Sequence, residues 1–131
     1  MSNKILSGLI ALSLLGALSC NRPTEVRTVV ELDVFSGRPN PRWELDGAAS
    51  QRLRQLQGDL TSGGPALEPA GLGYRGFVYG DGRGQVRAYR GYVTTPRGVL
   101  ADPSHSIEQF LLNELPAEYA AIRETILAEI R

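Results

Sequence analysis

The strongest constraint on the fold is the alternation of side chains between Val26 and Val34. Apolar or β-branched residues occupy every second position of this stretch, and most of the positions between them are charged. This period of two predicts a half-buried strand over 25–35, because successive side chains of a strand point to opposite faces. Pro39 and Pro41 then end the strand, since proline cannot donate a ladder hydrogen bond. A half-buried strand needs partner strands and a core beneath one face.

Weaker strand patterns supply the partners. Residues 43–45 fit a short strand that runs back after the proline-rich turn. Residues 74–79 and 85–94 fit a hairpin around the glycine-rich turn 80–84, which contains the Asp-Gly pair typical of tight turns. The neighbouring glycines leave the register of this hairpin open.

Helical patterns follow the strands. Asp46 is placed as the N-cap of a helix whose apolar residues recur at helical spacing, namely Ala49, Leu53, Leu56 and Leu60. A second helix is expected from Pro103 to Glu114 and a third after Pro116, because the residue before a proline avoids the α region. This order predicts an α+β fold, with a small antiparallel sheet of about four strands packed against two or three helices.

The first twenty residues carry a different pattern. Lys4 precedes an apolar run from Ile5 to Leu18, which leads into Cys20, the only cysteine. This order is typical of a bacterial secretory signal, and the run is shorter than the ~20 residues that span a membrane. The segment resembles the signal and lipobox of bacterial lipoproteins, with Ala17 where that family usually has leucine.

The resemblance implies that Cys20 is diacylated and becomes the first residue of the mature chain. Residues 1–19 are then a signal peptide, 20–24 a lipidated tether and 25–131 a single globular domain. We expect a lipid-anchored protein of the cell envelope, in the outer membrane or facing the periplasm, whose membrane contact runs through Cys20. Secretion after ordinary signal cleavage is the alternative.

The charge balance argues against a nucleic-acid partner. The chain has 14 basic and 14 acidic residues, and Lys4 is its only lysine. After position 20 the acidic residues therefore exceed the arginines by one. Nucleic-acid-binding domains instead carry a clustered excess of positive charge.

Catalytic and metal-binding patterns are scarce. His105 is the only histidine, and it lies in Asp102-Pro103-Ser104-His105-Ser106, where the Asp and Ser side chains suit the capping of a helix. A Ser/His/Asp relay from these neighbours is unfavourable, because adjacent side chains at a helix start diverge. One histidine and one acylated cysteine do not suffice for zinc. We therefore expect no catalytic residues, no metal, no cofactor and no enzymatic activity.

The segment from Phe35 to Trp43 is the best candidate for a binding surface. It places Arg38, Asn40, Arg42 and Trp43 in a stretch stiffened by two prolines, and a stiff loop loses little entropy on binding. The alternative interpretation is that Trp43 fills the core and Arg38 bonds the carbonyls of its own loop.

Three functions remain open at this level. The first is a lipid-tethered binding or structural module that engages an envelope protein or an extracellular ligand through this loop or through the outer face of the tyrosine-rich hairpin. The second is a small secreted hydrolase that uses Asp33 with Arg38 or His105, which requires these side chains to converge in a cleft. The third is an inhibitor or immunity-type protein, which requires the loop around Asn40 to project from the body.

Overall fold

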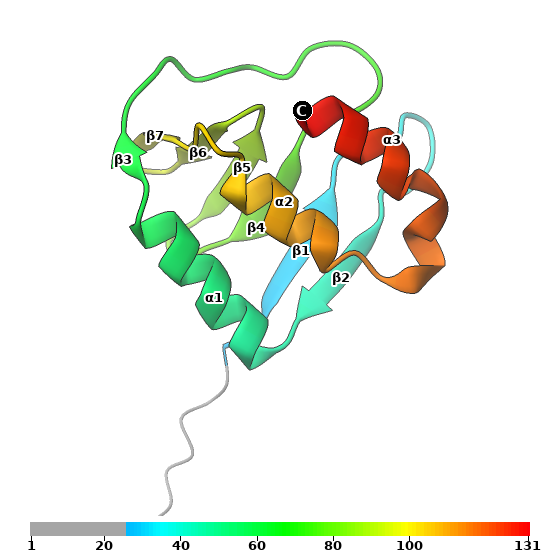
Figure 1. Ribbon diagram of the computed structural model, residues 1–131, viewed down its shortest axis with the longest axis horizontal. Coiled ribbons are helices and arrows are strands. Elements are labelled where there is room, and N and C mark those ends of the chain that lie inside the picture. Colours follow the sequence, from blue (N-terminus) through cyan, green and yellow to red (C-terminus); the bar gives the residue numbers. More distant parts are fainter. Residues whose placement is uncertain (1–25) are drawn as a thin grey trace, which may run out of the picture.

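The computed structural model describes residues 26–131. The predicted signal peptide, the predicted lipidation site Cys20 and the tether 20–24 lie outside the described residues. Figure 1 shows an antiparallel sheet with the helices gathered over one of its faces. The α+β class predicted from the sequence is thus confirmed for the described domain. Among its helices, none has the length and the apolar character needed to cross a membrane.

The sheet is larger than the predicted four strands. Within the described residues it has seven strands in the order β2-β1-β4-β5-β6-β7-β3, and each neighbouring pair is antiparallel. The strands are β1 (Thr28–Leu32), β2 (Arg42–Leu45), β3 (Thr61–Ser62), β4 (Phe77–Gly80), β5 (Gln85–Tyr89), β6 (Tyr92–Thr95) and β7 (Gly98–Ala101).

Two turns explain why the expected strand count was wrong. The segment 85–94 is not one strand, because Arg90 and Gly91 adopt positive φ angles of 49° and 77° and reverse the chain between β5 and β6. An arginine rarely adopts this conformation, so the turn has a weak sequence signal. The chain reverses again between Thr95 and Gly98, which adds β7, and β3 pairs with the edge of β7.

The helices follow the predicted pattern more closely. They are α1 (Gly47–Gly58), α2 (Ser106–Asn113), the 3-10 turn η1 (Ala117–Tyr119) and α3 (Ala120–Ile130). Asp46 caps α1 as predicted, since its carboxylate accepts a hydrogen bond from the amide of Ala49 at 2.8 Å. Asp102 caps α2 by accepting from the amides of Ser106 and Ile107. The capping interpretation of the segment around His105 is therefore confirmed for Asp102, whereas the Ser106 hydroxyl donates to Asp102 and does not cap the helix.

The core lies between the helices and the inner face of the sheet. Val30 and Leu32 of β1 and Phe77 of β4 are fully buried there, together with Leu111 of α2 and Ile126 of α3. The alternate residues of β1 and its neighbours point to the opposite face, which the described helices leave uncovered. That outer face carries charged side chains, and the ion pairs among them form the candidate site.

Candidate functional site

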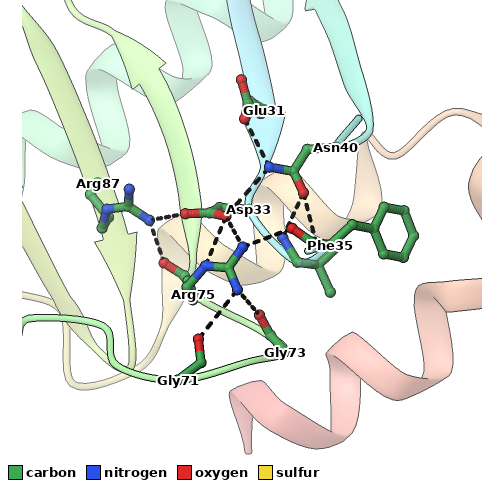
Figure 2. Close-up of polar contacts among 9 residues, drawn as sticks. Glu31, Asp33, Phe35, Asn40, Gly71, Gly73, Arg75 and Arg87 are labelled. Carbon is green, nitrogen blue, oxygen red and sulfur yellow. Dashed lines mark hydrogen bonds and ion pairs between the residues drawn. The ribbon is translucent and has the colours of Figure 1, made fainter. Parts of the chain in front are cut away.

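Asp33, directly after β1, is the centre of a charged cluster on the outer face (Figure 2). Arg75, just before β4, donates to its Oδ1 through Nη2 at 2.7 Å and through Nε at 3.0 Å. Arg87 of β5 donates to its Oδ2 at 2.8 Å. Only 16% of the Asp33 side chain is exposed, so water weakens these charge-assisted bonds little.

The two arginines also bond the backbone around them. Arg75 donates to the carbonyl oxygens of Phe35, Gly71 and Gly73, and Arg87 donates to the carbonyl oxygen of Arg75 itself. The cluster thereby joins the end of β1 to the long segment that precedes β4 and to β5. Segments that lie 42 and 54 positions from Asp33 are held at one point.

The environment of Asp33 favours its ionised form. Burial on its own raises the pKa of this carboxyl, but the hydrogen bonds and positive charges of Arg75 and Arg87 outweigh that effect and hold the pKa below its usual range. Asp33 is therefore a poor general base at neutral pH, since its carboxylate oxygens are occupied and weakly basic.

Asn40 fastens the proline-rich loop to the same cluster. Its Oδ1 accepts hydrogen bonds from the amides of Val34 and Phe35 at 3.0 and 2.8 Å. Its amide nitrogen donates to Glu31 at 3.0 Å and to Asp33 at 3.4 Å. Asn40 thus uses both ends of its side chain to hold the loop against β1, as Figure 2 shows.

The other three binding candidates lie in different environments. Arg38 is exposed, and its guanidinium lies 3.5 Å from the centroid of the Phe35 ring. Arg42 is also exposed, with Glu31 at 4.0 Å. Trp43 packs against the core and meets the Phe77 ring edge-on, with centroids 6.4 Å apart. The core alternative for Trp43 thus agrees with its packing, and the predicted binding role of the four residues stays a prediction.

The residues required for the hydrolase do not come together. Asp33 bonds arginines 75 and 87, Arg38 stacks on Phe35, and His105 contacts Glu108 at 3.2 Å. Glu108 is buried and also accepts hydrogen bonds from the Tyr74 hydroxyl and from the amide of Gly91. Burial and the neighbouring Glu108 raise the pKa of Tyr74. This second cluster joins α2 to the turn between β5 and β6.

Residues 26–131 contain no group of three His, Cys, Asp or Glu side chains that could hold a metal ion. Sequence reasoning missed Arg75 and Arg87, the two partners of Asp33. Neither residue has a local signal, because each meets Asp33 only after the strands have paired. The alternation of β1 placed Asp33 on the outer face, and the identity of its partners came from the tertiary structure.

Replacement of Asp33 by Asn should destabilise the domain in a pH-dependent way. The lowered pKa means that the folded state binds the Asp33 proton less readily than the unfolded chain does, so the stabilisation is fully present above the ordinary pKa of about 4. At pH 7 we expect a loss of about 2–3 kcal/mol in the free energy of unfolding, measured by urea denaturation.

The difference between wild type and D33N should shrink as the pH falls below about 4, because the wild-type carboxylate becomes protonated. Asp46→Asn removes the same charge and retains a good N-cap, so it should change stability by only a few tenths of a kcal/mol. A D33N deficit that stays constant from pH 7 to pH 3 would contradict the ion-pair account.

Substitutions of Asn40 and Arg38 should have different effects on stability, because Asn40 holds the loop in place whereas Arg38 is exposed. Asn40→Ala leaves two part-buried amides without an acceptor and should cost about 2 kcal/mol, or roughly 8–16 °C in Tm. Arg38→Ala removes an exposed cation–π contact and should cost less than about 1 kcal/mol. Calorimetry of both variants checks the contrast, and a larger loss for R38A than for N40A would reverse the assignment.

Comparisons of this chain with protein families, with curated proteins and with solved structures found no match.

Proposed function

We propose that the protein is a lipid-anchored, exported binding module of the bacterial cell envelope. The lipobox-like segment that ends at Cys20 supports the anchoring, and two acyl chains suffice for stable membrane attachment. The ordered loop 36–41 supports the binding role. Its ligand approaches from the side of Arg38 and Arg42, whose side chains are exposed.

The observation that carries the binding role is the rigidity of this loop. Asn40 bonds two amides and two carboxylates, and Arg75 bonds the carbonyl oxygen of Phe35. Five interactions thus fix the two ends of this short, proline-containing segment, at Phe35 and at Asn40, before any partner arrives. A preordered loop loses little conformational entropy on binding, and arginine is among the residues that contribute most at interfaces.

The position of the loop favours a broad contact over an inserted one. Pro41 is buried, and its carbonyl oxygen accepts a hydrogen bond from the amide of Leu32 at 3.0 Å. Asn40 holds the preceding turn against the end of β1. This arrangement supports a surface that lies against a partner, whereas an inhibitor of the protease-blocking kind needs a loop that projects into a cleft.

The anchoring predicts a change of location when Cys20 is replaced by Ser. The native protein should fractionate with membranes, and its intact mass should correspond to a chain that starts at Cys20 and carries acyl groups. Without the thiol no acyl chain can be attached, so the C20S protein should leave the membrane fraction once its signal is removed. Continued membrane association of processed C20S, or an unmodified native mass, would contradict the lipid anchor.

The binding surface predicts position-dependent cross-linking in cells. A photoreactive benzoylphenylalanine in place of Arg38 should give a discrete cross-linked adduct, because this position lies at the centre of the proposed contact. The same substitution at Arg52, an exposed residue of α1, serves as the control. Adducts of equal yield at both positions, or none at position 38, would contradict the assignment of the loop.

A further inference from the structure

A cavity beside α1 is lined by three arginines. A pocket of about 600 Å³ opens between the C-terminal half of α1, the turn that joins β4 to β5 and the turn that joins β6 to β7. Each element contributes one exposed arginine to the lining, namely Arg54, Arg83 and Arg97. These residues are 14 or more positions apart in the sequence, so only the fold collects them around one cavity.

The three guanidinium groups are uncompensated. Within residues 26–131 none of them forms an ion pair or a side-chain hydrogen bond, unlike Arg75 and Arg87. Asp81 is the one carboxylate in the lining, and its Oδ1 already accepts hydrogen bonds from the amides of Arg83 and Gly84 at 2.9 and 3.2 Å. Three positive groups and one negative group therefore leave the pocket cationic.

A neutral donor adds to this set. Gln57 lines the same pocket, and its Oε1 accepts a hydrogen bond from the Tyr79 hydroxyl at 2.8 Å. That bond fixes the side-chain amide with its NH₂ group as the remaining polar end. The pocket thus offers several N–H donors to a ligand, against one carboxylate oxygen, Oδ2 of Asp81, that accepts no hydrogen bond within the described residues. This excess of donors complements an oxyanion.

We propose that this arginine pocket binds a phosphoryl group. The planar guanidinium presents paired N–H donors that match two oxygens of a phosphate, and three such groups from separate elements can surround a tetrahedral anion. The net positive charge suits a phosphate ester better than it suits a neutral polar ligand.

The neighbouring surface indicates the source of the phosphoryl group. A second pocket of about 590 Å³ shares Arg54, Gln57 and Asp81 with the first and continues along apolar side chains that include Val26, Val29 and Leu53. A phosphoryl site that continues into an apolar groove fits the headgroup and upper acyl region of an anionic phospholipid. Val26 and Val29 are 61% and 41% exposed, so this groove presents apolar surface to the solvent.

The lipid source rests on the proposed anchoring, whereas the phosphoryl site does not. Val26 follows Cys20 by six positions, which span at most about 20 Å of extended chain. A membrane that holds acylated Cys20 is therefore within reach of the arginine pocket. The loop 36–41 follows the other end of β1 and would then face away from that membrane.

The test uses the chain from position 20 onward with Cys20→Ser, so that neither the apolar segment 5–18 nor an acyl chain contributes to binding. Its partitioning is measured on vesicles of phosphatidylglycerol with phosphatidylcholine and on vesicles of phosphatidylcholine alone, and titration with inorganic phosphate forms a separate arm. The double variant R83Q/R97Q removes two positive charges from the pocket. The control R52Q/R131Q removes two from exposed positions outside its lining.

We expect binding to phosphatidylglycerol vesicles, a loss of about tenfold or more in R83Q/R97Q and a much smaller loss in R52Q/R131Q. Phosphate binding that R83Q/R97Q abolishes, without vesicle binding, would support the phosphoryl site and overturn the membrane as its source. Equal losses in both variants, or no binding of either probe, would overturn the site. The intact mass of the native protein tests the anchor separately, so an unacylated chain with a working pocket would contradict only the proposed function.

Discussion

The double ion pair of Asp33 is the interaction on which the outer face of this domain depends. A single carboxylate bonds Arg75 and Arg87 and so connects the end of β1 to the segment before β4 and to β5. Arg75 extends the connection to the carbonyl oxygens of the flanking loops. The three charges compensate one another at low exposure, and removal of Asp33 would leave two arginines without their ionic partner. Asn40 connects the proline-rich loop to this cluster, because its side-chain amide donates to Glu31 and Asp33.

The one-sided arrangement of the helices determines where function can lie. The inner face of the sheet is committed to the core, where Val30, Leu32 and Phe77 are fully buried. The outer face and the two ends of the strands remain accessible. The proposed contact loop and the proposed phosphoryl pocket lie at opposite ends of β1, which suits a module that is attached to a membrane at one end and presents a binding surface at the other.

Much of the fold could be predicted because its signals are local. The alternation of β1, the cap residue Asp46 and the break at Pro116 each act within a few residues, and the structure contains the expected elements. The predicted sheet of four strands was too small because a turn within the segment 85–94 was not predicted. The turn at Arg90 and Gly91 places an arginine at positive φ. Arginine rarely adopts this conformation, so the sequence pattern did not predict a turn there.

The candidate site, too, was predictable only where its signals are local. Sequence alone placed Arg38 and Asn40 in a loop with two prolines and Asp33 on the face away from the core, because proline positions and strand alternation are properties of neighbouring residues. Only the tertiary structure decided that the Asn40 side chain accepts hydrogen bonds from the backbone after β1 and that Asp33 pairs with two arginines. It also decided that Arg54, Arg83 and Arg97 line one pocket. Such contacts join positions far apart along the chain, so strand order and register decide which charges meet, and no local pattern encodes them.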